Sequence, residues 1–172
     1  VDMDGHLVGI NTAIFSRSGG SHGIGFAIPS NMVRLVVQAA LQGGTVQRPW
    51  FGASLQPVTS DLAESLGLDR PGGALIKGVY AKGPAARAGL KAGDVVVSID
   101  GKRVQDPQAL QYRFVTKGLG GSAELGIMRH GQAMTAKVPM VAAVEDPPRD
   151  ERDVDGRNPL VGAKVANLSP AV

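Results

Sequence analysis

The chain has 172 residues, of which 43% are hydrophobic, 4% aromatic and 19% charged, a composition typical of soluble globular proteins. The net charge of +3 is small and the Lys and Arg residues are scattered, which argues against nucleic-acid binding. The lack of cysteine excludes disulfides and thiolate metal sites, and no apolar run reaches the length of a membrane span.

The first segment, residues 1–46, predicts a β-hairpin followed by one helix. The apolar runs HLVGINTAIF (6–15) and GIGFAIP (23–29) flank a polar, glycine-rich loop, which is the usual pattern of a hairpin. Ser30 or Asn31 can cap a helix through MVRLVVQAALQ, and Gly43 and Gly44 end it. Since a hairpin and a single helix make a thin core, we expect the apolar face of this helix to pack on a partner outside the segment.

The hairpin loop contains GGSHG (19–23), which fits the G-x-S-x-G pattern of a nucleophile elbow. An elbow needs a strand, a sharp turn and a helix, whereas this motif lies between two expected strands. His22 is the direct neighbour of Ser21, while a triad histidine comes from elsewhere in the fold. We interpret the motif as a surface loop. A hydrolase that uses Ser21 is the alternative, and labelling of Ser21 by a fluorophosphonate probe would support it.

The second segment, residues 47–144, predicts one complete α+β core. A strand beginning at Phe51 precedes a short helix, SDLAESLGL, capped by Ser60. The strands GALIKGVY and DVVVSIDG follow, with the turn and helix GPAARAGLKAG between them. A helix then runs from Pro107 to Gly118, and the closing strands AELGIMRHG and QAMTAKVPMV meet at a turn of His130 and Gly131.

The remaining residues predict a linker and the start of another module. EDPPRDERDVDG, within residues 145–157, is charged, holds two prolines and has few apolar residues, as exposed linkers do. In residues 158–172, the run Leu160-Val161-Gly162-Ala163 repeats the pattern of Trp50-Phe51-Gly52-Ala53. A second copy of the middle module is therefore expected to begin here.

Few residues suggest catalytic or metal chemistry. The three histidines have no metal-ligand spacing. Asp94 is expected to accept backbone hydrogen bonds in a turn, and the acidic residues near position 150 are expected to be solvated. GLGGS (118–122) lacks the lysine and the helix of a phosphate-binding loop. We expect no metal site, no cofactor and no catalytic residue in this chain.

The run GGALIKGVYAKGPAARAGLKAGDVVVSIDGKRV resembles a PDZ domain of the HtrA/Deg (Do-like) serine proteases. The first segment is similar to the end of the trypsin-like domain of that family, and NPLVGAKVANLSPAV is similar to the opening of its second PDZ domain. The resemblance implies a PDZ-type, partly open β-barrel or sandwich with two helices. A hairpin and helix remnant of a trypsin-like β-barrel domain would precede it.

The resemblance also implies a cellular role. The catalytic histidine, aspartate and serine of the family lie upstream of the first residue, so this chain is expected to be inactive, although its parent would be a serine endopeptidase. The family acts in protein quality control in the periplasm or cell envelope. The parent is expected to be a trimer-based homo-oligomer, with no nucleic-acid partner.

PDZ modules bind extended peptides by adding them as a strand to the edge of a sheet. The expected partners are peptides or unfolded proteins with apolar C-termini. Leu110 and Phe114 share a helix face and could line the groove or belong only to the core. Phe51 could also belong only to the core, but a place in the loop is favoured for it. In an alternative, structural reading, the same edge docks on another subunit. The predicted carboxylate-binding loop is Arg48, Trp50, Phe51, Gly52 and Ala53, and the predicted groove is Ser54, Leu55, Gln56, Leu110 and Phe114.

Overall fold

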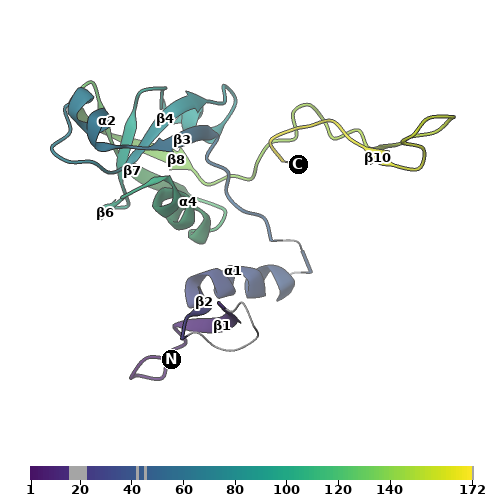
Figure 1. The fold of residues 1–172 in the computed structure, drawn as a ribbon, viewed down its shortest axis with the longest axis horizontal. Helices are drawn as coiled ribbons and strands as arrows, with labels where there is room; N and C mark the ends of the chain where they lie inside the picture. The colour runs from purple at the N-terminus through teal and green to yellow at the C-terminus, as the bar shows by residue number, and fades with distance from the viewer. Residues whose placement is uncertain (16–22, 42, 45, 172) are drawn as a thin grey trace. The chain divides into compact units, whose positions relative to one another are not determined.

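The computed structural model describes residues 1–15, 23–41, 43, 44 and 46–171. The chain divides into two compact units, Val1–Gln47 and Arg48–Val172 (Figure 1). The predicted loop at Ser21 and His22 lies outside the described residues. None of the helices in the described ranges is long and apolar enough to cross a membrane.

The first unit is the predicted hairpin and helix. Strand β1 (Gly9–Ile14) pairs antiparallel with β2 (Gly25–Pro29), and helix α1 (Ser30–Leu41) follows directly. Gly43 has φ +66° and donates its amide to the carbonyl of Ala40, so a glycine in the left-handed region ends the helix as expected. No described residue of α1 is buried, and Phe26 on β2 is 55% exposed. This unit therefore leaves its apolar residues without a core of its own.

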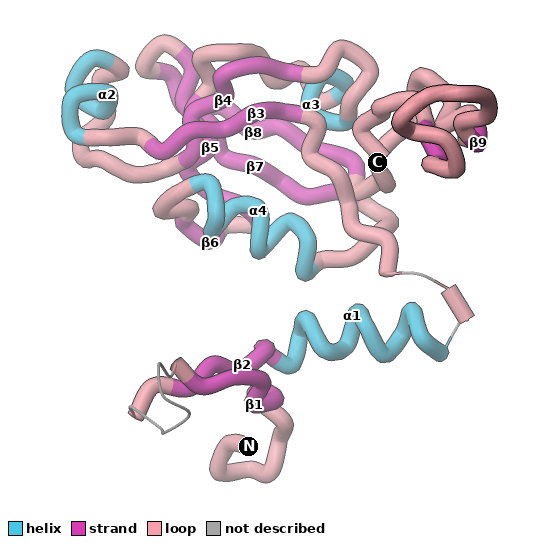
Figure 2. Tube along the Cα trace, turned by 45° about the vertical axis from the view of Figure 1, so that its right-hand side comes forward, coloured by secondary structure: helices cyan, strands magenta, loops and turns pink. Residues whose placement is uncertain are grey.

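The second unit is built around an open antiparallel sheet (Figure 2). Its strand order is β3-β4-β5-β7-β8, with β6 paired to β5. The strands are β3 (Ala53–Pro57), β4 (Ala74–Val79), β5 (Val95–Ile99), β6 (Lys102–Arg103), β7 (Ser122–Arg129) and β8 (Gln132–Pro139). Strand β6 was not predicted. It forms because Asp100 (φ 47°) and Gly101 (φ 73°) make a tight turn that folds the chain back on β5.

The helices of the second unit lie close to their predicted positions: α2 (Ser60–Ser65), α3 (Pro84–Arg87) and α4 (Pro107–Thr116). Thr59, not the expected Ser60, caps α2, because the Thr59 side chain accepts the amide of Leu62. Asp106 caps α4 through a 2.7 Å hydrogen bond from the amide of Ala109. Figure 2 shows α4 lying along the sheet, and its residues Leu110 and Phe114 belong to the main core.

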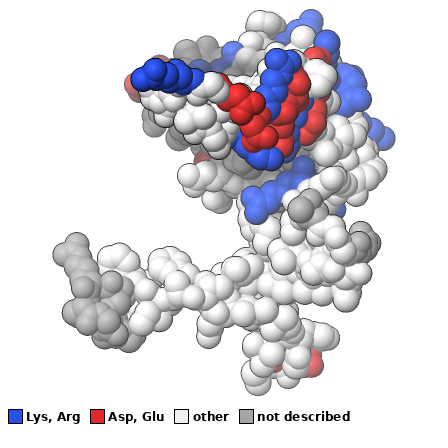
Figure 3. Space-filling model, turned by 90° about the vertical axis from the view of Figure 1, so that its right-hand side faces the viewer, with Lys and Arg blue, Asp and Glu red and all other residues white. Residues whose placement is uncertain are grey.

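The predicted linker is exposed over most of its length but contains a short strand. Strand β9 (Arg152–Asp153) pairs antiparallel with β10 (Lys164–Val165). Arg149 forms ion pairs with Glu145 at 2.9 Å and with Glu151 at 3.6 Å. Figure 3 accordingly shows acidic and basic side chains intermixed on one face of the molecule, not a patch of a single sign.

Candidate functional site

A groove of about 340 Å³ lies between strand β3 and helix α4. Three of the predicted site residues do not line this groove: Arg48, Ser54 and Gln56. The lining residues are Pro49, Trp50, Phe51, Gly52, Ala53, Leu55, Pro107, Leu110, Gln111, Phe114 and Val115. Sequence reasoning missed Pro49 and three residues of α4. Those three continue the i, i+3, i+4 spacing of Leu110 and Phe114, so extending the helix face would have found them.

Strand β3 is the end strand of the sheet. Its inner edge pairs with β4, from Ala53 opposite Val79 to Pro57 opposite Ala74. Among the described residues, no strand pairs with its outer edge. The outer edge therefore offers backbone N–H and C=O groups on the side of the groove, as an edge strand does.

The loop before β3 has fixed carbonyl groups and available amides. The carbonyl of Phe51 accepts the amide of Ala85 at 3.1 Å, and the carbonyl of Gly52 accepts the amide of Tyr80 at 2.9 Å. Within the described part of the chain, the amides of Phe51 and Gly52 donate no hydrogen bond. The amide of Trp50 differs, because it donates to Val141 at 2.9 Å. Successive free amides in a loop of this kind form a binding site for an anion.

Gly52 has two independent reasons to be glycine. Its φ of +74° lies in the left-handed region, and a Cβ at this position would lie 2.9 Å from Cδ of Pro84 and 3.1 Å from Cα of Gly83. The loop therefore packs directly on the start of α3. Gly83 and Pro84, at the start of the GPAARAGL stretch, thus pack against the predicted carboxylate-binding loop. Sequence reasoning did not assign this supporting role to them.

The floor of the groove is part of the protein core. Leu110 and Phe114 are 1% and 2% exposed, and the ring of Phe114 meets Phe51 edge to face with centroids 5.3 Å apart. Phe51 and Leu55 are half-buried and pack against the same core. The sequence left core and groove as alternatives for Leu110 and Phe114. In the structure both apply, because these side chains belong to the core and also line the groove.

A buried ion pair fastens the turn after α3. Asp94 is 1% exposed and accepts hydrogen bonds from Nε and Nη2 of Arg129 at 2.6 and 2.7 Å and from the amide of Lys91 at 2.8 Å. Burial raises the pKa of the Asp94 carboxyl, but these hydrogen bonds outweigh burial and leave the pKa below its usual value. Asp94 therefore has the structural role in a turn that the sequence predicted.

A second hollow, of about 530 Å³, opens on another part of the sheet between the 67–72 loop and the β5–β6 turn. Val97 and Met128 contribute apolar surface, and Arg70 and Arg103 also line it. It is larger than the groove beside β3, but its lining does not include the end strand β3. The β3–α4 groove is consequently the better candidate for binding an extended chain.

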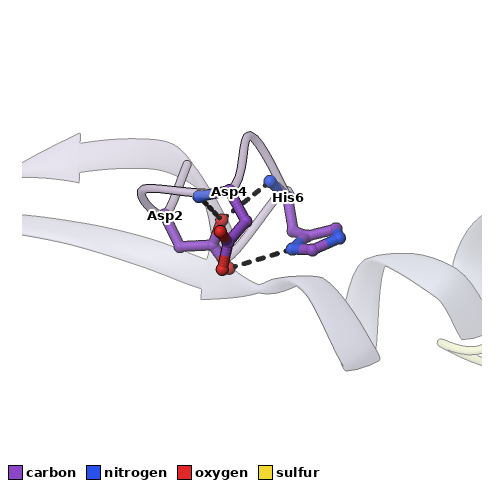
Figure 4. Close-up of side chains that lie close together, drawn as sticks. All are labelled: Asp2, Asp4 and His6. Carbon is purple, nitrogen blue, oxygen red and sulfur yellow. Dashed lines mark hydrogen bonds and ion pairs between the residues drawn. The ribbon is translucent and has the colours of Figure 1, made fainter.

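Asp2, Asp4 and His6 lie close together in the first unit (Figure 4). One carboxylate oxygen of Asp2 accepts the amides of Asp4 and His6 at 3.0 and 2.8 Å, and the other lies 3.3 Å from Nδ1 of His6. All three residues are exposed. The bonds to Asp2 are those of a local turn held by an aspartate side chain.

Comparisons with known proteins agree on one family. The sequence model of the PDZ domain matches residues 75–124. A probable periplasmic serine endoprotease, DegP-like, from Bartonella henselae is 43% identical over 155 residues, covering 90% of this chain and 30% of the relative. A protein of the same name from Brucella suis is 45% identical over 145 residues, covering 84% of this chain and 28% of the relative. The chain thus spans about 30% of the length of these relatives.

Two solved structures extend the comparison. A variant of the HtrA-type protease AlgW with decapeptide has a TM-score of 0.62 and 40% identity, over 86% of this chain and 45% of that one. The structure of AlgW with tripeptide has a TM-score of 0.58 and 42% identity, over 81% and 46%.

Proposed function

Because the chain contains a PDZ domain and is homologous to the DegP-like HtrA serine endoproteases, we propose that it binds the C-terminal ends of extended peptides. The peptide adds as a strand to the outer edge of β3. Its terminal carboxylate lies against the amides of Phe51 and Gly52. Among the described residues, no strand pairs with this edge, and the two amides at one end of it donate no hydrogen bond. This combination is the observation that carries the proposal.

The last side chain of the peptide enters the apolar part of the groove. Leu55, Leu110 and Phe114 line this part, which favours a medium-sized apolar residue. Burial of one such side chain contributes roughly 1.5–3 kcal/mol, and the entropy lost on association offsets much of the total gain. We therefore expect dissociation constants of about 1 µM or weaker.

The division of the chain into domains follows from the same homology. We assign residues 1–46 to the end of a trypsin-like domain, 47–144 to the PDZ domain, 145–157 to a linker and 158–172 to the start of a second PDZ domain. The exposed apolar residues of the first unit, such as Phe26 and Val36, support the first assignment, because they need a partner surface. The run Leu160-Val161-Gly162-Ala163 supports the last one, since it repeats the pattern of Trp50-Phe51-Gly52-Ala53.

The activity of the whole protein is proposed from its relatives. These are named periplasmic serine endoproteases, and we place this protein in the periplasm, with unfolded proteins as substrates. We assign no catalytic residue within this chain. A trimer-based assembly is part of the same proposal, and the role of the PDZ domain is to hold exposed C-termini for the protease.

The test is a titration of the ¹⁵N-labelled chain with a hexapeptide that ends in valine. Two control peptides have the same sequence, one with an amidated C-terminus and one ending in aspartate. We expect shift changes at the loop and groove, centred on Phe51, Gly52, Leu55 and Phe114, and at least about tenfold weaker binding of both controls. Shift changes centred away from these residues, or equal affinity for the amidated peptide, would refute the proposal.

A further inference from the structure

The segment that follows the PDZ domain pairs with the second copy of the loop motif. The amide of Val154 donates to the carbonyl of Ala163, and the amide of Gly162 donates to the carbonyl of Val154, both at 2.8 Å. Strands β9 and β10 continue this pairing, with Asp153 opposite Lys164. Opposite charges at directly opposed positions favour this register.

The first copy differs at the corresponding glycine amide, as far as the described residues show. Gly52 and Ala53 of the first copy correspond to Gly162 and Ala163 of the second. The amide of Gly52 donates no hydrogen bond in the described part of the chain, whereas the amide of Gly162 is bonded to the linker. Both glycines are third in the repeated motif and both lie in the left-handed region, so the comparison is between corresponding positions of the motif.

The geometry of β3 shows which edge the linker occupies. Ala53 lies opposite Val79, and the amide of Tyr80 donates to the carbonyl of Gly52. In an antiparallel ladder this pattern makes Ala53 and Val79 a non-hydrogen-bonded pair. The N–H and C=O of Ala53 therefore point away from β4, toward the outer edge. The carbonyl of Ala163, which corresponds to that of Ala53, is the group that accepts the amide of Val154.

We propose that residues 152–154 are an intramolecular ligand of the second module. They add as a strand to its outer edge, the edge at which the first module is proposed to receive peptides, and they engage the amide of Gly162 in its loop. The first module is then open to peptides and the second is closed by its own linker. This inference rests on the proposed function, in that it assigns the second motif to a peptide-binding module.

The test removes one backbone donor, the amide of residue 154, and compares the result with a variant that keeps this amide. Val154→Pro lacks the amide that donates to Ala163 and breaks the pairing, whereas Val154→Ala at the same position retains it. Hydrogen exchange of the Gly162 amide is measured by NMR in the wild type and in both variants of the full 172-residue chain. We expect exchange about tenfold faster in Val154→Pro and unchanged exchange in Val154→Ala.

The same samples are titrated with the hexapeptide that ends in valine. In the wild type, shift changes are expected at the first loop and none at Gly162. Peptide-induced changes at Gly162 in the wild type, or equal exchange rates at Gly162 in Val154→Pro and the wild type, would overturn the inference. Neither result bears on the first loop, where the absence of peptide-induced shifts at Phe51 and Gly52 would refute the proposed function.

Discussion

Replacement of Gly52 by alanine tests the link between the loop and α3. Gly52 has φ +74°, and an added Cβ would lie 2.9 Å from Cδ of Pro84 and 3.1 Å from Cα of Gly83. The left-handed conformation costs an alanine about 1–2 kcal/mol. The two close neighbours are a proline ring and a backbone atom, which cannot rotate away, and such overpacking costs about 1–3 kcal/mol more. We expect Gly52→Ala to lower the free energy of unfolding by about 2–5 kcal/mol.

The chain offers a matched control in Gly131. This glycine also has φ +74°, but nothing lies within 4 Å of an added Cβ, so Gly131→Ala isolates the cost of the backbone conformation. Urea denaturation of both variants separates that cost from the packing against Gly83 and Pro84. Equal destabilisation of the two variants would contradict the packing argument.

Gly52→Ala is also expected to weaken peptide binding. Movement of the loop away from α3 shifts the amides of Phe51 and Gly52, and loss of one hydrogen bond to a charged carboxylate costs about 1.5–3 kcal/mol. Calorimetric titration of the folded variant with the valine-ending peptide should therefore show affinity reduced about tenfold or more. Gly131→Ala should bind as the wild type does. Unchanged affinity in Gly52→Ala would refute the assignment of this loop to the carboxylate.

The remaining predictions concern the ion pair, the groove wall and the first unit. Asp94→Asn should lower the free energy of unfolding by about 1.5–3 kcal/mol at pH 7, because it removes the buried carboxylate that accepts hydrogen bonds from Arg129 and from the amide of Lys91. Urea curves at several pH values check this. Folding lowers the pKa of Asp94, so the stabilisation by its carboxylate is present above pH ~4 and is lost as pH falls through the folded pKa. If the stability difference between Asp94→Asn and the wild type were as large at pH 2 as at pH 7, this reasoning would be contradicted. Gln111 lies in the groove lining, so Gln111→Glu should repel the peptide carboxylate and weaken its binding about twofold at low salt. Gln108 lies on the same helix outside the lining, and Gln108→Glu should leave binding unchanged. Equal effects of the two variants in a binding titration would argue against the groove. Phe26 is 55% exposed, so Phe26→Ser should reduce the binding of an apolar dye. The urea midpoint of the second unit should not change, because Phe26 belongs to the first unit. An unchanged dye signal would show that the ring is covered.

Local sequence patterns predicted most of the elements. The apolar run VVVSI and the Asp-Gly pair after it mark a strand and its turn, and Pro107 marks the start of a helix, since these residues restrict the backbone wherever they occur. The PDZ fold itself was identified from the combined pattern of GPAARAGLKAGD and its flanking strands. The short strand β6 was missed because two residues carry too little periodicity to be read.

Tertiary structure alone decided how the site is assembled. The sequence placed Gly52 in the predicted carboxylate-binding loop, but only the tertiary structure shows that an added Cβ would crowd Gly83 and Pro84. The sequence left Phe114 as either core or groove, and in the fold it is both, because it is 2% exposed within the core and also lines the groove beside β3. Pairing of Val154 with Gly162 and Ala163 was likewise beyond prediction. Local conformation depends on neighbouring residues. Whether a strand edge or an amide is available depends instead on whether a segment distant in sequence is hydrogen-bonded to it in the folded chain.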